Sequence, residues 1–545
     1  MSAAPHQYYY LENFRNALAW LWRRYEDLLT PEEAGFVAVF QRLPQQSAAL
    51  LVRMITRRGD LFRTDRLVYE EIGCPRAAAA ALIDAGLVDP APELSWPDWQ
   101  RLLTKSELAA TFAVPSGLQR SCKPQLMQYL QATQDSAPAR SVWCAHAGET
   151  IYRLSVALLC ERLRILFFGN FRQDWSEFVL TDLGIYRYER VSIDAGARAF
   201  SRRAEIDQFF ALYRCREQLR AGAPAEQVLA EMPPPLSGCD WIEARRARLV
   251  IETAHQFEKA GQLAAALGAY DDCDDPRSRV RAIRVLEKLG CWQEAWEQLQ
   301  RFESECASEP AKQLSERIRR RVSRRLGHPV GPLCSPAWPT LHIELARPTE
   351  PGGLESAAAV HLACADAPVF YVENTLLNSL LGLWCWEAIF APVPGAFFHP
   401  FQSAPADLLA ADFRSRRAAQ FAVCKASLDA GTYRAQIRRT FEEKAGLASP
   451  FVAWDWLTPE LLELALECIP AEHLCLYFER MLADIGANRA GLPDLIQFYP
   501  RLRRYRLIEV KGPGDRLQNN QTRWLSFCTA AGIDVAVCKV AWETV

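Results

Sequence analysis

The chain has 545 residues, 63 lysines and arginines, 65 aspartates and glutamates, and a formal net charge of −2. Half of its residues are hydrophobic and 16 are tryptophan, which excludes a disordered chain and allows three or four domains. The 17 cysteines contain no Cys-x-x-Cys pair, which argues against a zinc ribbon and indicates reduced thiols in the cytoplasm. The opening residues lack a secretory signal, and Pro392 and Pro394 interrupt the most apolar stretch, so we expect no membrane span.

The first 90 residues are predicted to form a helical domain. Apolar residues recur at helical spacing over residues 7–58, and residues 61–90 have the pattern of a further small helical unit. A proline-rich connector, DPAPELSWPD, then marks a boundary.

Residues 91–135 are predicted to form a small DNA-binding motif. The segment LLTKSELAATFAVPSGLQRSCKPQLMQYL favours two short helices around a turn near residues 115–117, and it resembles an SAP motif, which contacts the DNA backbone. Lys105, Arg120 and Lys123 would then bind phosphates. Two of only nine lysines in the chain fall here, which favours binding. Packing of short helices without DNA contact is the alternative.

Residues 136–240 are expected to be an α-rich linking region, and residues 241–335 contain a repeat. The segments FEKAGQLAAALGAY and LEKLGCWQEAWEQL align at a spacing of 29 residues, which matches Ala266 with Ala295. A glycine in the turn and a small residue where helices approach are typical of helical-hairpin repeats. We expect the repeat to bridge other domains, with a protein-docking face as the alternative.

Arginine clusters are the expected DNA contacts of a chain whose net charge is nearly zero. One cluster, ERIRRRVSRR, contains Arg317, Arg320 and Arg321, which we predict to be DNA-binding residues. Local patches bind phosphates whatever the charge of the whole chain. A solvated helix face is the alternative for each cluster.

The last domain is predicted to span residues 336–545. A linker rich in proline and glycine, RRLGHPVGPLCSPAWPT, precedes the strand-like LHIELARP. Residues 376–389 then form a strongly apolar segment with spacing compatible with a helix.

Two acids and a lysine are the candidate catalytic residues. Asp494 of GLPDLIQF and Glu509 of YRLIEVKG each lie beside a short apolar run of strand character. Side chains alternate along a strand, so Glu509 and Lys511 face one side and Val510 the other. If the two runs pair, Asp494, Glu509 and Lys511 meet at one sheet end. Carboxylates suit Mg²⁺ or Mn²⁺, and a lysine can orient a water, so the pattern predicts a nuclease. A surface strand with a salt bridge is the alternative.

A helix is expected after these strands. Asp515 could cap it, and its apolar side would carry Leu517, Trp524, Leu525 and Cys528 up to Gly532. Gln521, one turn before Trp524, could hydrogen-bond a ligand or DNA, or it could be a solvated helix side chain.

The run GLPDLIQF followed by YRLIEVKGPGDRLQNNQTRWL resembles the VRR-NUC branch of the PD-(D/E)xK nucleases, and more narrowly the Fanconi-associated nuclease family. The segments HQYYYLENFRNALAWLWRRYEDLLTPEE and ILFFGNFRQDWSEFVLTDLGIYRYE are similar to that family too, so the resemblance covers nearly the whole chain. It implies a mainly α-helical amino-terminal two thirds, with an SAP-like motif and tetratricopeptide-like helical repeats. An α/β restriction-endonuclease-like nuclease domain follows.

The resemblance also assigns residues. The family has one more acid upstream, and Glu373 in YVENTLLNSLLGLWCWEAIF is the best match. Glu373, Asp494 and Glu509, with the backbone carbonyl of Val510, would hold one or two Mg²⁺ or Mn²⁺ ions. Lys511 would be the catalytic lysine. Gln521 would be an accessory residue. An acid at a helix N-terminus is the alternative for Glu373.

The implied activity is that of a 5′-flap endonuclease and 5′-to-3′ exonuclease that unhooks DNA interstrand crosslinks. The expected partner is branched DNA with a 5′ flap, and the expected setting is a monomer at the bacterial nucleoid. The ubiquitin-binding zinc finger that opens animal members is not expected. A four-way-junction resolvase and a non-catalytic DNA-binding scaffold are the alternatives.

Overall fold

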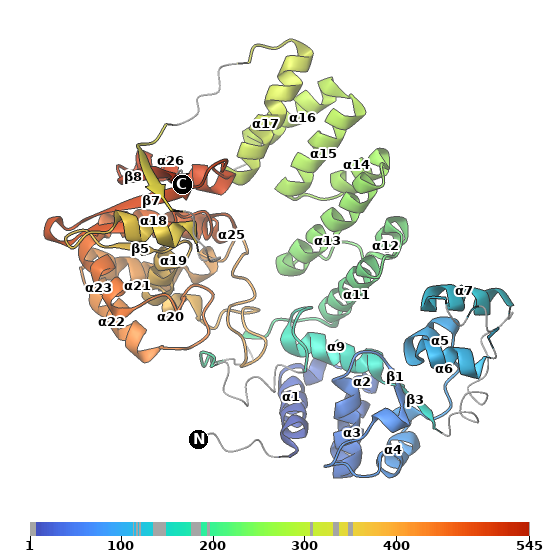
Figure 1. The fold of residues 1–545 in the computed structure, drawn as a ribbon. Coiled ribbons are helices and arrows are strands. Elements are labelled where there is room, and N and C mark those ends of the chain that lie inside the picture. The colour runs from blue at the N-terminus through green and yellow to red at the C-terminus, as the bar shows by residue number, and fades with distance from the viewer. Residues whose placement is uncertain are drawn as a thin grey trace. The chain divides into compact units, whose positions relative to one another are not determined.

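The structure, a computed structural model, describes residues 7–543 except 113, 116–117, 119–120, 134–148, 176–186, 193–196, 306–308, 331–336 and 347–352. The chain divides into two compact units, residues 1–186 with 201–203 and residues 187–200 with 204–545 (Figure 1).

Four helices form the body of the first unit, and the first three lie in residues 7–58, where the apolar spacing predicts helices. They are α1 (Tyr9–Tyr25), α2 (Pro31–Arg42), α3 (Gln45–Ile55) and α9 (Ala157–Phe168). The start of α2 is fixed by Thr30, whose side chain accepts a bond from the Glu33 N–H while the Glu33 carboxylate accepts one from the Thr30 N–H. Phe14 of α1 and Phe40 of α2 meet edge to face in the core, with ring centroids 5.1 Å apart.

A three-stranded antiparallel sheet lies beside these helices and corrects the helical interpretation of residues 61–90. Its order is β1 (Leu61–Arg63), β3 (Ile151–Leu154), β2 (Val88–Asp89), and only α4 (Pro75–Asp84) is an α-helix within that range. The central strand comes from residues beyond the SAP-like segment. Strands this short carry too little alternation to be recognised from sequence.

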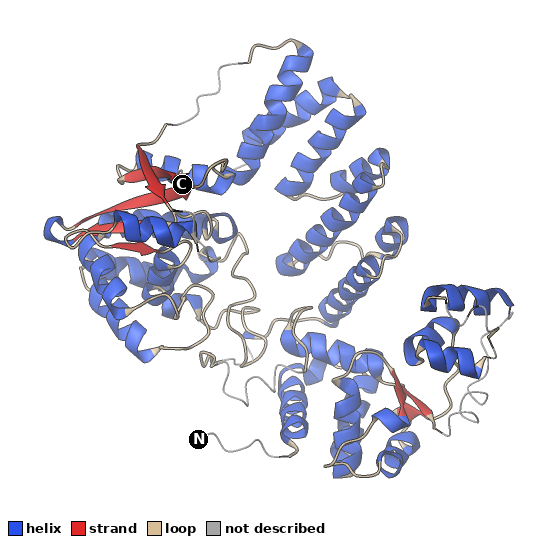
Figure 2. Ribbon diagram, in the orientation of Figure 1, coloured by secondary structure: helices blue, strands red, loops and turns tan. Residues whose placement is uncertain are grey.

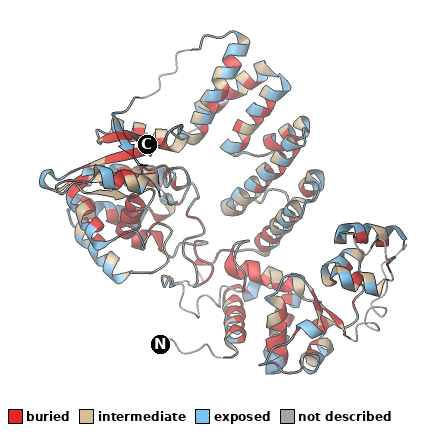
Figure 3. Ribbon diagram, in the orientation of Figure 1, coloured by how far each residue is buried: buried red, intermediate tan, exposed pale blue. Residues whose placement is uncertain are grey.

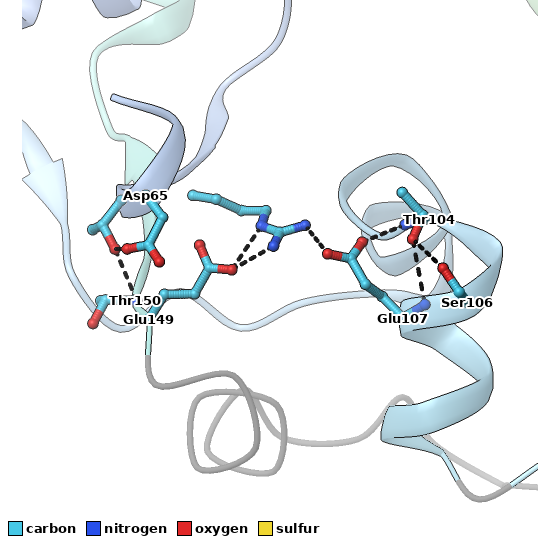
Figure 4. A network of polar contacts seen from close by, with 8 residues as sticks. Asp65, Thr104, Ser106, Glu107, Glu149 and Thr150 are labelled. Atoms are coloured by element: carbon cyan, nitrogen blue, oxygen red, sulfur yellow. Dashed lines mark hydrogen bonds and ion pairs between the residues drawn. The ribbon is translucent and has the colours of Figure 1, made fainter. Parts of the chain in front are cut away.

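The SAP-like segment contains the two predicted helices and one more. These are α5 (Trp96–Leu102), α6 (Lys105–Thr111) and α7 (Lys123–Thr133), packed around Trp99, Leu108 and Leu126. Arg63 of β1 ties the segment to the sheet. Its guanidinium donates to Glu107 of α6 at 2.7 Å and to Glu149 at 3.0 Å (Figure 4). A bidentate arginine of this kind restrains both elements it bridges.

Consecutive antiparallel helices open the second unit. They are α11 (Arg203–Arg220), α12 (Ala225–Glu231), α13 (Asp240–Lys259), α14 (Leu263–Asp271), α15 (Pro276–Leu289), α16 (Trp292–Glu305) and α17 (Glu309–Leu326) (Figure 2). The 29-residue repeat has a structural counterpart here. Gly261 and Gly290 both turn the chain in the left-handed region, with φ of 78° and 79°, and Ala266 and Ala295 are both fully buried. The repeat therefore encodes two similar helical hairpins; their classification as tetratricopeptide repeats stays a prediction.

A five-stranded mixed sheet forms the centre of the last domain (Figure 2). Its order is β4 (Thr340–Leu345), β8 (Val535–Trp542), β7 (Arg504–Lys511), β6 (Leu495–Tyr499) and β5 (Val369–Tyr371). The β4–β8 and β8–β7 pairs are parallel, whereas the β7–β6 and β6–β5 pairs are antiparallel. The predicted α/β fold of this domain is confirmed.

Helices cover both faces of this sheet, and buried residues follow the two inner surfaces (Figure 3). The helix α18 (Leu354–Leu362) packs with Ile508 and Val510 on one face. The other face carries the larger core, built from α19 (Leu376–Trp384), α20 (Trp386–Ile389), α21 (Ala418–Asp429), α22 (Tyr433–Glu443), α23 (Pro459–Cys468), α24 (Ala471–Ala483), α25 (Ile485–Asn488) and α26 (Asn519–Ala530). The apolar segment 376–389 is thus two helices that break at Cys385, not one.

Gly491 allows the N-terminus of α26 to approach the loop that precedes Asp494. Its φ is +88°, and an added Cβ would lie 2.6 Å from Cγ of Asn520. We expect Gly491→Ala to destabilise the protein by about 2–4 kcal/mol, because backbone strain and overpacking add. Thermal unfolding measures this change.

The matched control is Gly514→Ala. This glycine has a φ of +89°, but no atom lies within 4 Å of the added carbon. It should cost only the backbone strain, about 1 kcal/mol. Equal losses in the two variants would contradict the packing argument.

Candidate active site

The β6–β7 hairpin brings the two predicted acids together. Leu495 pairs with Ile508 in the antiparallel register, so the next position outward sets Asp494 opposite Glu509. The Val510 N–H donates to Oδ2 of Asp494 at 2.7 Å, which joins the two strand ends at this point. The pairing assumed from the sequence is the one that the structure has.

Alternation along β7 places the lysine next to the glutamate. Glu509 and Lys511 share one face, and Lys511 Nζ donates to Oε1 of Glu509 at 2.6 Å. Val510 faces the other way into the core beneath α18. The ammonium therefore lies against a carboxylate that is completely buried.

Glu373 lies in the short connection between β5 and α19. Its carboxylate accepts bonds from the Tyr371 hydroxyl at 2.8 Å and from Nδ2 of Asn374 at 3.2 Å. The preceding Val372 N–H donates to the carbonyl of Asp494 at 2.8 Å, so this connection is attached to the start of β6. The structure brings Glu373 into electrostatic range of both acids of the hairpin.

Gln521 has a local structural partner. Its Oε1 accepts from the N–H of Gln518 at 2.8 Å, and the Gln518 side chain accepts from the Gln521 N–H, so the pair caps α26. Asp515, expected as the cap, instead accepts from the Gly512 N–H at 3.0 Å. The helix begins three residues later than expected, because a glutamine pair that starts at Gln518, and not Asp515, fixes its start.

Burial and mutual repulsion govern the charge state of the hairpin acids. Burial, with the nearby charges of Glu373 and Glu355, raises the pKa of Asp494 to about 6, although Val510 and Lys511 oppose the rise. Burial and the charge of Asp494 raise the pKa of Glu509 to about 8, against the lowering effect of Lys511. Two such carboxylates favour a neighbouring cation, which would relieve both the burial and the repulsion.

The unpaired oxygen of Glu509 bears on whether the site fits a divalent metal ion. Oε2 of Glu509 is buried and has no hydrogen-bond partner. A buried carboxylate oxygen without a partner costs free energy, because it has lost its hydrogen bonds to water. Among the described residues, no group of three His, Cys, Asp or Glu side chains is arranged to hold a metal as it stands. Glu373 is held by Tyr371 and Asn374, and Glu509 by Lys511. The donor chemistry, three carboxylates of which one has an unpartnered buried oxygen, fits a hard divalent cation.

Two predicted phosphate contacts lie at one corner of the SAP-like segment. Lys105 begins α6, and Lys123 begins α7. The Lys123 ammonium donates to the carbonyl of Leu103 at 2.6 Å, beside the start of α6. Arg120 lies outside the described residues.

The predicted arginines of α17 all have partners within the protein. Arg320 donates to Glu316 at 3.0 Å, and Arg321 to Glu287 at 2.6 Å. Arg317 donates to Oδ1 of Asn519 at 2.5 Å. The last contact joins the helical hairpins to α26, the helix that carries Gln521.

Three side chains near the acids were not identified from the sequence. Tyr371 bonds Glu373, Glu355 of α18 adds a negative charge near Asp494, and Trp456 packs edge to face on Tyr371. Period-two alternation in VFYVEN places Tyr371 and Glu373 on one face and could have identified the first. The other two come from distant segments, and no local pattern indicates them.

Comparisons with known proteins identify the family of this chain. The family model of the VRR-NUC domain matches residues 429–542, and that of the FAN1 HTH domain matches residues 8–89. A Fanconi-associated nuclease 1 homolog of Pseudomonas aeruginosa is 48% identical over 99% of this chain and 97% of its own length. The chain belongs to the Fanconi-associated nuclease family.

Other members of the family are similar at lower identity. The Arabidopsis thaliana homolog is 24% identical over 99% of this chain and 68% of its own length. Crystal structures of paFAN1 with 5′-flap DNA that contains a gap match closely. The complex with a two-nucleotide flap has a TM-score of 0.93 and 47% identity over 100% of both chains, and the complex with a one-nucleotide flap has a TM-score of 0.92.

Membership of this family makes the protein an enzyme that hydrolyses DNA, and its VRR-NUC domain depends on a divalent metal ion. Of the helices that the structure describes, none is long and apolar enough to cross a membrane. The multidomain fold predicted from the sequence, helical first and α/β last, is confirmed.

The raised pKa values predict how stability depends on pH when metal is absent. A carboxyl whose folded pKa is raised stabilises the fold at low pH, and that contribution is lost as the pH rises through the folded value. We expect the melting temperature in EDTA to fall from about pH 4, where unfolded carboxyls lose their protons, up to about pH 8. The contribution of Asp494 should be lost by about pH 6 and that of Glu509 by about pH 8. A divalent cation added at about pH 8 should reverse the fall.

The variant Glu509→Gln removes the charge and should reduce the fall in melting temperature. Glu460→Gln changes an exposed acid at the start of α23 and serves as the control. The same fall in the Glu509 variant as in the wild type would contradict the assignment.

Proposed function

We propose that this protein is a structure-specific DNA nuclease that cuts 5′ flaps near the junction. It would also degrade DNA from 5′ to 3′ and help to unhook interstrand crosslinks in repair. The observation that carries the proposal is the match, over both whole chains, to paFAN1 bound to 5′-flap DNA. Similarity that extends beyond the nuclease domain supports a shared substrate as well as shared chemistry.

Each residue of the site has a proposed role. Glu373, Asp494 and Glu509, with the carbonyl of Val510, would hold one or two Mg²⁺ or Mn²⁺ ions, since these hard cations prefer oxygen ligands. When bound, such an ion supplies a Lewis acid and lowers the pKa of water. The unpartnered oxygen of Glu509 and the raised pKa of both hairpin acids support this assignment.

Lys511 supplies the fixed positive charge of the site. Its bond to Glu509 holds the ammonium at the same end of β7, where it would orient the attacking water and offset charge on phosphorus. Lysine suits this role because its ammonium is a compact point charge. Gln521 would act as an accessory residue, through the cap that fixes the start of α26.

The other segments would divide the remaining work. Lys105, Arg120 and Lys123 of the segment 91–135, with Arg317, Arg320 and Arg321 of α17, would contact DNA phosphates. The DNA-binding segment 91–135 would be supported by residues 1–90 and 136–240. The hairpins of residues 241–335 would connect it to the nuclease domain of residues 336–545. The partner would be branched DNA, bound by a monomer. The bacterial nucleoid in the cytoplasm is the proposed setting, because a reducing compartment suits the free cysteines of the described residues.

The first test compares the wild type with Asp494→Ala on labelled 5′-flap, 3′-flap, four-way-junction and duplex DNA in Mn²⁺. We expect the wild type to cut the 5′ flap near its junction. The variant should lose at least about 100-fold in rate, because a buried metal ligand is removed, and it should still bind the flap. Glu460→Gln, an exposed acid on α23, is the control and should cut normally.

Symmetric and preferred cutting of the four-way junction would indicate a resolvase instead. Binding without any metal-dependent cutting would leave a DNA-binding scaffold. Each outcome therefore separates the three functions considered from the sequence.

Phosphate contacts are tested by the salt dependence of binding. We expect Lys105→Gln to weaken flap binding and to reduce the slope of log affinity against log salt by about 1, because one counterion-releasing contact is lost. Lys425→Gln changes an exposed lysine of α21 that is outside the proposed contacts, and it should leave the slope unchanged. Equal slopes in both variants would remove Lys105 from the interface.

A further inference from the structure

Trp456 is an exposed aromatic side chain beside the site. Among the described tryptophans it alone is mostly exposed, at 55%, whereas Trp384, Trp386 and Trp524 are buried. Its ring packs edge to face on Tyr371, with centroids 5.8 Å apart and an interplanar angle of 69°. An edge-on contact with Tyr371 leaves much of the tryptophan surface open to solvent.

The contact connects Trp456 with the candidate metal ligands. The Tyr371 hydroxyl donates to Oε2 of Glu373 at 2.8 Å, so only one tyrosine side chain separates the tryptophan from that carboxylate. A DNA strand whose phosphate reacts at this site must pass this surface within a few nucleotides.

The backbone holds Trp456 in place before any substrate arrives. The N–H groups of Trp456 and Leu457 both donate to the carbonyl of Ala453 at 3.0 Å. Leu457 is buried, and Thr458 then caps α23 by accepting from the Leu461 N–H at 3.1 Å. A rigid aromatic loses little conformational freedom on binding, which favours its use as a contact.

The preceding loop is also tightly packed. A Cβ added at Gly382 of α19 would lie 2.8 Å from both Phe451 and Val452, and the Ala453 N–H donates to the Ser379 hydroxyl at 3.1 Å. Asp455, the neighbour of the tryptophan, is exposed and would repel phosphate. The surface is therefore suited to the flat face of a base and not to the DNA backbone.

We propose that Trp456 is a stacking platform for one nucleobase of the strand that is cut. This inference rests on the proposed function and adds a base-binding subsite to it. Stacking on an aromatic ring tolerates any base, because each base presents a π face. Such a contact would fix the position of the reacting phosphate without adding sequence specificity.

The test combines Trp456 variants with abasic substitutions. Single nucleotides on each side of the cut position in a 5′-flap substrate are replaced, one at a time, by abasic residues. Single-turnover cutting in Mn²⁺ and equilibrium binding in EDTA are measured for wild type, Trp456→Leu and Trp456→Phe. Leu502→Ala is the control, because it removes an exposed side chain between β6 and β7.

On the intact flap we expect Trp456→Leu to lower the single-turnover cutting rate about fivefold or more, because one stacked base loses its platform. Trp456→Phe should keep most of the rate, and Leu502→Ala should keep all of it. At one abasic position the cutting rate of the wild type should fall by the same factor as the Trp456→Leu substitution causes on the intact flap. The rate of Trp456→Leu itself should not fall further at that position. That shared loss identifies the stacked base.

If the loss of rate caused by Trp456→Leu and the loss caused by the abasic residue multiply at every position, the proposal is overturned. Trp456 would then be only a packing partner of Tyr371. The proposal is also overturned if Trp456→Leu cuts the intact flap at the same rate as the wild type. If the wild type binds flaps but cuts none, the proposed function fails, and the binding measurements with the same abasic series still decide whether Trp456 stacks.

Discussion

The antiparallel register of the β6–β7 hairpin is the constraint on which the rest of the site depends. It sets Asp494 opposite Glu509, two carboxylates that burial and repulsion both disfavour. Lys511 and the Val510 N–H compensate only part of this cost, since one oxygen of Glu509 stays without a partner. A shift of one residue would turn each acid to the other face of the sheet, so the packing of both cores protects the geometry.

The core of the site could be derived from local patterns alone. Strand alternation separates Glu509 and Lys511 from Val510, and two neighbouring apolar runs suffice to pair Asp494 with Glu509. The hairpin repeat was equally local, because Gly261 and Gly290 mark their turns directly in the sequence. Glu373 needed a family resemblance, since no spacing rule relates it to the hairpin.

The features that could not be predicted from the sequence depend on distant contacts or on very short elements. The sheet of the first unit has strands of two to four residues, and its central strand follows the SAP-like segment. Asp515 looked like a helix cap, but a Gln518–Gln521 pair starts α26 instead. Trp456 comes from a turn before α23 and meets Tyr371 only through the tertiary fold.

The helix α26 connects the chemistry to the helical hairpins. Its first turn touches Gly491 ahead of Asp494 through Asn520, and Arg317 of α17 bonds Asn519. Arg523, further along α26, donates to Gln313 of α17 at 2.6 Å, and Nε2 of Gln313 donates to the carbonyl of Asn519 at 3.3 Å. Three hydrogen bonds therefore join the same two helices. These bonds attach α17 to the helix that packs on the segment leading into the β6–β7 hairpin. Arg317 holds this contact, while Arg320 and Arg321 bond Glu316 and Glu287, so these positive charges of α17 are engaged within the protein. Any phosphate contact proposed for these arginines would have to compete with those bonds.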